Sequence, residues 1–189
     1  MHPDFDLPLT RGRISGRASS ITAAFFQAIT PAVLPTDDEV DEALAILGMA
    51  PGRCRCAYCG DAKTEWDHFR PTVLNRQPTG YITEIANLVP SCGKCNQSKG
   101  NKHWKAWMLG AAVRSPSRRR IADLDARIAR LEAFEGWRTP VRIDYAALLG
   151  TARWALYLRH LETAVSHLAD AQALASGFLA LTTEAAKRR

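Results

Sequence analysis

All five cysteines of the 189-residue chain lie between residues 54 and 95. Four of them form two C-x-x-C pairs, one at Cys56 and Cys59 and the other at Cys92 and Cys95. Two such pairs can close a tetrahedron of thiolates around zinc, and this spacing is typical of structural zinc sites. A single pair could be a redox centre, but the second pair favours a metal. We therefore predict one structural Zn²⁺ site made of these four thiolates, with Cys54 as a bystander.

Between and just after the cysteine pairs lie residues that could hydrolyse a phosphodiester. His68 can take a proton from water at neutral pH, because the ordinary pKa of imidazole is about 6.5, and it is our candidate general base. The oxygens of Asp67 and Asn96 suit Mg²⁺ or Mn²⁺ bound mostly through water and phosphate. Taken singly, Asp67-His68 could be a surface dipeptide, Asn87 a turn residue and Asn96 a helix cap. Their order along the chain favours catalysis.

The elements that position these residues are short. Side chains at neighbouring strand positions point to opposite faces, so the backbone must bend at Asp67 and His68 if both serve one site. Residues 75–80 form a polar, turn-rich loop, and residues 85–90 predict a short apolar strand. The polar stretch after Asn96 leads into a helix that carries Trp104, Trp107 and Met108. We expect His103 two turns further along the face that carries Asn96, as a phosphate or packing residue.

This arrangement resembles the HNH family of nucleases over about residues 53–109. Four features coincide in order: the first cysteine pair, Asp67-His68 followed by Pro71, Asn87-Leu88, and the run from Cys95 to Gly100. Together they are far more specific than any one of them. The third motif position holds Asn96 in place of the histidine for which the family is named.

The resemblance implies an α+β protein with a small zinc-stapled ββα-metal core, in which a hairpin is followed by a helix. It also implies that Asn87 holds the loop and orients His68 through hydrogen bonds, in a supporting role. The activity that it implies is metal-dependent endonucleolytic cleavage of DNA that leaves a 5′ phosphate, with His68 as the base and the divalent ion held by Asp67 and Asn96.

The charge distribution predicts a polyanionic partner. The formal net charge is +6, and residues 85–122 contain no acidic side chain. Because phosphate contacts supply most non-specific affinity for nucleic acid, we interpret the cations of this stretch as a DNA-binding surface. The predicted contacts are Lys94, Lys99, Lys102, Lys105, Arg118, Arg119 and Arg120, and Arg114 lies in the same stretch. A solvated charge run is the plainer interpretation of Arg118 to Arg120 alone.

The flanking regions are predicted to be helical. We expect helices at residues 19–29 and 40–47, the second capped by Thr36 and stopped by Gly48. A further amphipathic helix runs from Ile121 to Phe134 and ends at Gly136. Apolar spacing predicts more helix over residues 145–187, with Gly150 and Gly177 as breaks. The resulting organisation is an N-terminal helical arm (1–49), a nuclease core (50–113) and a C-terminal helical region (114–189).

The length of the C-terminal region is compatible with a helical hairpin, a homodimer interface or both. His160 and His167 lie in it and are expected to be solvated. No long apolar run and no signal-peptide pattern is present, so we expect a cytoplasmic protein. Two alternatives remain open: a non-catalytic zinc module that binds nucleic acid, and an RNase of the same fold, because nothing in the motif reads a 2′-hydroxyl. Restriction or phage defence, mobile-element homing and phage packaging all employ such nucleases, and the size of the chain with its helical arms favours the first.

Overall fold

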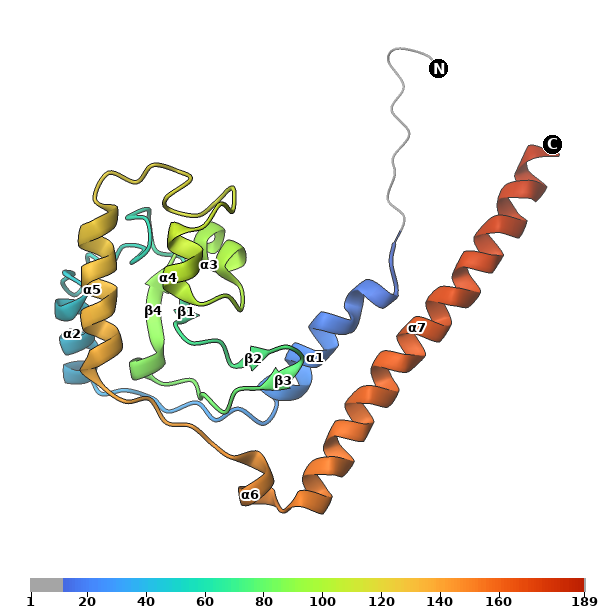
Figure 1. Ribbon diagram of the computed structural model, residues 1–189, viewed down its shortest axis with the longest axis horizontal. Helices are drawn as coiled ribbons and strands as arrows, with labels where there is room; N and C mark the ends of the chain where they lie inside the picture. The colour runs from blue at the N-terminus through green and yellow to red at the C-terminus, as the bar shows by residue number, and fades with distance from the viewer. Residues whose placement is uncertain (1–11, 189) are drawn as a thin grey trace, which may run out of the picture. The chain divides into compact units, whose positions relative to one another are not determined.

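The computed structural model describes residues 12–188, and the chain forms two compact units. One unit comprises residues 26–149, and the other joins residues 12–25 to residues 150–188. Figure 1 traces the chain through its elements. The first unit contains all the candidate catalytic and zinc-binding residues. It also contains the helices that directly precede and follow these residues in the chain.

The centre of the larger unit is a two-stranded antiparallel ribbon followed by a helix. Strand β1 (Glu65–His68) pairs with β4 (Leu88–Ser91) in an uninterrupted register that runs from Glu65↔Ser91 to His68↔Leu88. Helix α3 (Gly93–Lys99) begins two residues after β4 ends (Figure 1). The predicted α+β fold with a ββα core is therefore confirmed.

The connection between β1 and β4 is more structured than the predicted polar loop. Strands β2 (Val73–Leu74) and β3 (Gln77–Pro78) pair in an antiparallel hairpin. Its two turn residues, Asn75 and Arg76, have φ of 51° and 61°. Two successive positive φ values define a type I′ turn, which matches the twist of paired strands. A single 3-10 turn, η2 (Ile85–Asn87), then leads into β4.

Large aromatic side chains form the core around the ribbon. Phe69 directly follows β1 and stacks on Trp104 of α4 (Trp104–Leu109), with ring centroids 5.2 Å apart. Its other neighbour is Phe134 of α5 (Leu124–Trp137), whose ring meets it edge-on at 5.5 Å. All three rings are almost fully buried. Because they join residues far apart in sequence, these contacts fix the strand that carries His68 against two helices.

Helices α3 and α4 are separate, which corrects the prediction for His103. Gly100 caps α3 with φ of 52°, a left-handed conformation that favours glycine, and α4 starts only at Trp104. His103 therefore does not share a helix face with Asn96. Its exposed ring stacks on Trp104 instead, at a centroid distance of 6.0 Å.

The predicted helix boundaries are confirmed in part. Helix α2 (Asp37–Ile46) has a complete capping box between Thr36 and Glu39, and Gly48 follows it with φ of 70°. Helix α5 instead continues through Gly136 to Trp137, so the predicted stop at Gly136 was wrong. The difference is a single residue, because Trp137 is the last residue of α5. The short helix α6 (Tyr145–Leu149) closes this unit.

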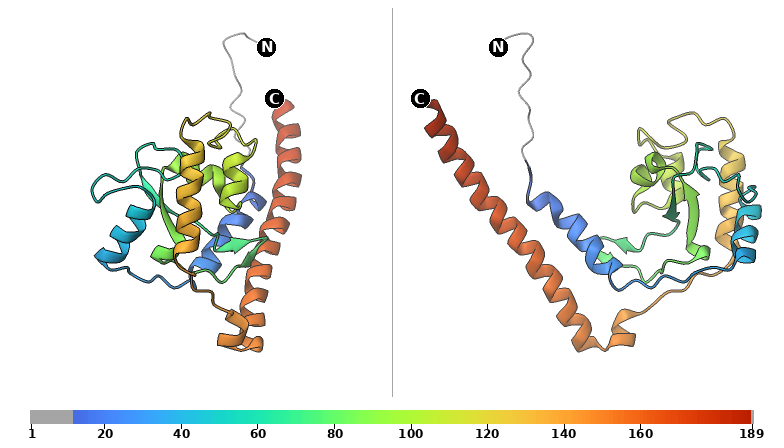
Figure 2. Two further views of the ribbon diagram at one scale, coloured as in Figure 1. Left: turned by 60° about the vertical axis from the view of Figure 1, so that its left-hand side comes forward. Right: turned by 180° about the vertical axis from the view of Figure 1, so that it is seen from behind.

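The smaller unit is built on one long helix. Helix α7 (Thr151–Lys187) is unbroken at Gly177, contrary to prediction, whereas Gly150 does separate it from α6 (Figure 2). The 3-10 turn η1 (Ser15–Arg17) packs on it, and α1 (Ala18–Gln27) follows directly. The Tyr157 hydroxyl donates to the Phe25 carbonyl at 2.6 Å, and the two rings lie 5.4 Å apart. His160 and His167 are exposed, as predicted. Within the described residues, none of the helices has the length and apolarity needed to cross a bilayer.

Candidate functional site

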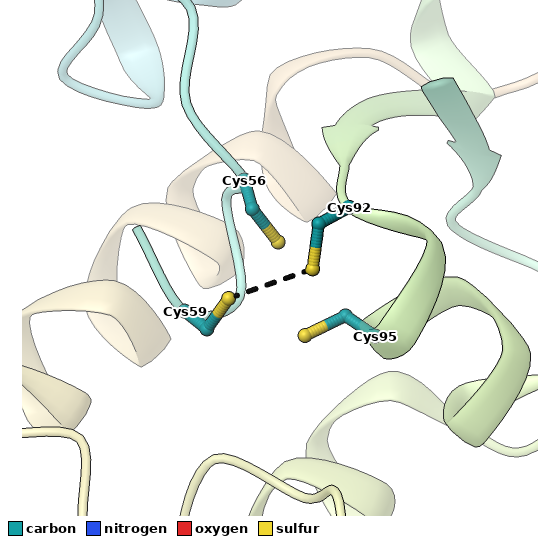
Figure 3. A group of neighbouring side chains, drawn as sticks. All are labelled: Cys56, Cys59, Cys92 and Cys95. Carbon is teal, nitrogen blue, oxygen red and sulfur yellow. Dashed lines mark hydrogen bonds between the residues drawn. The ribbon is translucent and has the colours of Figure 1, made fainter. Parts of the chain in front are cut away.

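The four cysteines of the two pairs converge at one end of the β1–β4 ribbon. Their sulfur atoms all lie within 4.8 Å of one another, and all four residues are buried (Figure 3). The Sγ atoms of Cys59 and Cys92 are 3.7 Å apart. A tetrahedron with zinc–sulfur bonds of about 2.3 Å would place its sulfur atoms about 3.8 Å apart. The four thiols are unbridged, so both the donor set and its geometry fit a structural zinc ion.

Basic side chains surround this thiol cluster. Arg119 donates to Cys95 Sγ at 3.6 Å and forms an ion pair with Asp61 at 2.9 Å. Arg127 donates to the carbonyls of Cys56 and Ala57, at 3.2 and 3.3 Å. Hydrogen bonding to Cys59, together with burial, raises the pKa of the Cys56 thiol to about 11. A bound cation would be needed to hold all four groups as thiolates. Cys54 is half-buried and lies outside the cluster, in keeping with a bystander.

His68 ends β1 at the opposite end of the ribbon. Its ring is half-buried, and Nε2 lies 2.8 Å from the Thr83 hydroxyl oxygen. Burial lowers the pKa of His68 from its ordinary value of 6.5, with Asp67 opposing that effect and Lys99 adding to it. The imidazole is therefore neutral at neutral pH, the form that a general base requires.

Asp67 lies on the other face of the same strand. Because the register is regular through residues 65–68, the bend that we expected between Asp67 and His68 is absent. The Asp67 carboxylate is buried, accepts a 2.6 Å hydrogen bond from the Tyr58 hydroxyl and pairs with the fully buried Lys99 ammonium at 3.0 Å. Burial raises the pKa of Asp67, while Lys99 and Tyr58 oppose that rise.

The Lys99 ammonium also reaches the backbone of the candidate base. Its Nζ donates to the His68 carbonyl at 2.8 Å, in addition to the ion pair with Asp67. Burial lowers the pKa of Lys99, and the Asp67 carboxylate opposes that shift. Lys99 therefore ties helix α3 to both residues of the Asp67-His68 motif from inside the protein.

Asn87 is fully buried and uses its amide as a clamp. Its Oδ1 accepts from the Arg70 backbone N–H at 2.8 Å, and its Nδ2 donates to the carbonyls of Arg70 and Ile82 at 3.1 and 3.2 Å. The Asn87 carbonyl accepts from the Phe69 N–H at 2.8 Å. These bonds hold the chain just beyond His68, and among the described residues none of them reaches the His68 ring that the resemblance expected Asn87 to orient.

Asn96 lies on α3, half-exposed, one turn before Lys99. Residues three apart on a helix share a face, so Asn96 and Lys99 lie on the same side of α3. A carboxylate offers about four lone-pair positions, and Tyr58 and Lys99 use about three at Asp67. The buried Asp67 carboxylate is thus largely occupied by protein partners, and a divalent ion held by Asp67 and Asn96 stays a prediction.

The basic stretch is less uniform in space than in sequence. Three of its cations have acidic partners from other segments: Lys99 pairs with Asp67, Lys105 with Glu132, and Arg119 with Asp61. Lys99 has no exposed surface at all, so it does not present its charge to a phosphate. Lys102 is exposed but donates to the carbonyls of Ser98 and Lys99. The exposed cations of this stretch without an acidic partner among residues 12–188 are Lys94, Lys102, Arg114, Arg118 and Arg120.

Two residues of this site were not predicted from the sequence. Tyr58 lies inside the first cysteine pair, where its hydroxyl had no evident partner, and Thr83 lies in the loop before η2. Each makes its contact only after folding, Tyr58 with Asp67 and Thr83 with His68. The position of Lys99 was easier to infer from the sequence than the contacts of Tyr58 and Thr83, because Lys99 follows Asn96 by one helical turn.

Comparisons with known proteins agree with this geometry. Residues 56–102 match a family described as HNH endonuclease. This segment of the chain is an HNH endonuclease domain. The matched residues include the cysteine cluster, β1, β4 and α3, and with them Asp67, His68, Asn87 and Asn96. Nucleases of this family act on DNA and use divalent metal ions.

One relative among curated proteins is the CRISPR-associated endonuclease Cas9 of Corynebacterium diphtheriae. It is 37% identical to this chain over 68 residues, which are 34% of this chain and 6% of the relative. The chain thus spans only a small part of that protein's length, and the likeness concerns the HNH domain. No solved structure matches the chain.

Proposed function

We propose that this chain is a metal-dependent endonuclease that hydrolyses DNA phosphodiester bonds with its HNH domain. The observation that carries the proposal is the placement of His68. Its ring is neutral, half-buried and hydrogen-bonded at the end of a strand whose backbone is held by both Lys99 and Asn87. A base fixed in this manner loses little entropy on reaching its reactive orientation.

In this proposal each residue has one task. His68 takes the proton from the attacking water. Asp67 and Asn96 would hold a Mg²⁺ or Mn²⁺ ion, as the resemblance implies, although the Asp67 carboxylate lies on the strand face opposite His68 and is bound by Lys99. The ion, when bound, supplies positive charge for the phosphate and the leaving 3′ oxygen. Asn87 fixes the chain after His68, and Lys99 neutralises Asp67 and secures the His68 carbonyl from within. The four cysteines bind a structural zinc ion that holds the far end of the ribbon closed.

Cleavage assays test this function directly. Purified protein is incubated with supercoiled plasmid, single-stranded DNA and RNA in Mg²⁺, Mn²⁺ or EDTA. We expect DNA cleavage that needs the divalent ion and leaves 5′ phosphate ends. His68→Ala should lower the rate by about 10² to 10⁴, the usual contribution of a general base, with zinc content and thermal stability unchanged. The control is His103→Ala, which removes an exposed ring outside the motif and should leave cleavage intact.

Two other outcomes correspond to the alternatives. Cleavage of RNA in preference to DNA would identify an RNase of the same fold. Binding of DNA without cleavage by either the parent protein or His68→Ala would favour a non-catalytic zinc module. Asp67 and His68 argue against the non-catalytic alternative. A ribbon that only carries a zinc site does not require a buried ion pair beside an oriented histidine.

For the biological setting we propose restriction or phage defence within the cytoplasm. The relative that the HNH domain resembles is named a CRISPR-associated endonuclease, and that name applies to the relative alone. A plating assay addresses the proposal: cells that express the chain should resist infection by some phage, and cells that express His68→Ala should not. Equal plating on both would remove the defence role without affecting the nuclease assignment.

A homodimer through the C-terminal helices stays a prediction. It rests on apolar side chains at the end of α7, where Leu174, Phe178 and Leu181 are all more than half exposed. Light scattering at micromolar concentration distinguishes the two states. A monomer that only nicks plasmid would exclude the dimer and leave the active site as proposed.

A further inference from the structure

The side chain that touches the His68 ring comes from a loop 15 residues away. The Thr83 hydroxyl oxygen lies 2.8 Å from Nε2. Within the described part of the chain, Thr83 is the side chain to which the His68 ring is hydrogen-bonded. The neighbouring Asp67 carboxylate lies on the opposite face of the strand, where it is bound by Tyr58 and Lys99. The orientation of the candidate base therefore depends on where Thr83 is held.

Thr83 is held by its own backbone on both sides. Its N–H donates to the Pro31 carbonyl at 3.0 Å, and its carbonyl accepts from the Val33 N–H at 2.8 Å. These bonds make a short parallel bridge between residues 31–33 and the loop. Three residues earlier, Gly80 accepts from the Ile143 N–H at 2.9 Å, so the loop is anchored at a second point. Thr83 is thus part of a braced backbone and does not depend on the ring for its position.

The contact also determines which ring nitrogen carries the proton. A neutral imidazole has one N–H and one bare nitrogen, and the hydrogen bond made by one nitrogen sets the role of the other. If Nε2 bears the proton, it has an acceptor in the Thr83 oxygen, and Nδ1 is left bare. If Nδ1 bears the proton, no described protein group accepts from it, and the Thr83 hydroxyl occupies the lone pair that a base must use.

We propose that Thr83 is a positioning residue for His68, accepting from Nε2–H and thereby leaving Nδ1 free to take a proton from water. This inference rests on the proposed nuclease function, because the proton comes from the water that attacks the phosphodiester. Thr83 itself touches neither water nor substrate in this scheme. The residues that brace it, Pro31 and Val33, connect the segment before α2 to the orientation of the base.

Thr83→Val tests the proposal, because valine keeps the branched shape and removes the hydroxyl. Loss of an orienting partner of a functional histidine typically costs about 10- to 100-fold, and we expect that loss in kcat with KM little changed. Thr83→Ser restores a hydroxyl and should recover most of the rate. The control is Thr79→Val in the same loop, which loses a 2.7 Å hydrogen bond to the Pro71 carbonyl but does not touch the ring.

A second measurement does not depend on activity. Nitrogen-15 NMR of the histidine side chains, at a pH where all rings are neutral, reports which nitrogen bears the proton, and His68→Gln assigns the signal. We expect the Nε2–H tautomer for His68 in the parent and in Thr83→Ser, and a mixture in Thr83→Val. This result holds even if no substrate is cleaved, so it separates failure of the positioning from failure of the proposed function.

Three outcomes would overturn the inference. An Nδ1–H tautomer in the parent would mean that Thr83 donates to the ring and blocks it. A higher kcat in Thr83→Val would give the same conclusion from kinetics. An unchanged kcat and tautomer in Thr83→Val, or an equal loss in Thr79→Val, would show that Thr83 contributes only to the stability of the loop.

Discussion

The β1–β4 ribbon carries a different kind of site at each end. At the Glu65–Ser91 end, four buried thiols form a closed ligand set with no place for a substrate. At the His68–Leu88 end, the half-buried His68 ring follows Asp67, whose carboxylate forms a buried ion pair with Lys99. Both ends belong to the same pair of four-residue strands. The difference indicates that the two ends have different roles. The closed end stabilises the fold, and the open end uses the resulting rigid backbone to orient a base.

Breaking the closed end should have the largest effect. We expect Cys95→Ser, or prolonged treatment with a strong chelator, to release the zinc and unfold the HNH domain, because structural zinc sites contribute on the order of 10 kcal/mol to folding. Elemental analysis and circular dichroism measure the two effects. Cys54→Ser is the matched control, since that thiol lies outside the cluster. A folded Cys95→Ser protein, or parent protein purified without zinc, would contradict the assignment of this end.

The ion pair between Asp67 and Lys99 at the open end should also matter for the stability of the fold. Asp67→Ala leaves the Lys99 ammonium buried without its partner, and breaking a buried pair from one side costs about 3 to 5 kcal/mol. Asn96→Ala removes a half-exposed amide and should leave the free energy of unfolding nearly unchanged, although both variants weaken binding of the divalent ion. Denaturant unfolding separates the two, and raised Mg²⁺ should partly restore cleavage by Asn96→Ala. Equal stability of both variants would show that Lys99 is not dependent on Asp67.

The contrast between the two ends also explains what could be predicted from the sequence. The cysteine cluster depends on two local spacings and the order of the motif, so it was predicted completely. The capping box at Thr36 and Glu39 is likewise local. The partners of His68 and Asp67 come from residues 15 and 32 positions away, and no local pattern records such pairings. For the same reason the acid-free stretch looked unopposed, although Asp61 and Glu132 lie against it in space.

Glycine illustrates the same limit. Gly48 and Gly150 end or separate helices with positive φ, whereas Gly136 and Gly177 continue inside them. All four look alike in sequence. What differs is the backbone conformation: Gly48 and Gly150 have φ of 70° and 82°, whereas Gly136 is the last residue but one of α5 and Gly177 lies well inside α7.

The pH dependence of cleavage should sharpen the description of the open end. Burial lowers the pKa of His68 below 6.5, so the neutral base persists to a lower pH than it would in water. We expect kcat/KM to rise as pH increases through this lowered pKa and then to level off, with a midpoint below 6.5. Rates between pH 5 and 8 at saturating metal give the curve. A midpoint above 6.5 would mean that a neighbouring anion outweighs burial, and the buried setting of the ring would need revision.

The smallest expected effect concerns the surface on which DNA would lie. Lys94 is exposed and has no acidic partner among the described residues, whereas Lys105 is paired with Glu132. A lysine that contacts a phosphate releases about one counterion on binding, so its removal lowers the slope of log affinity against log salt by about 0.9. Lys94→Ala should show that loss, and Lys105→Ala should show much less because Glu132 already neutralises it. Affinities for one duplex measured over a range of salt concentrations give both slopes. Equal slopes for the two variants would mean that DNA lies elsewhere, and a loss at Lys105 alone would mean that binding breaks the pair with Glu132 to recruit that lysine.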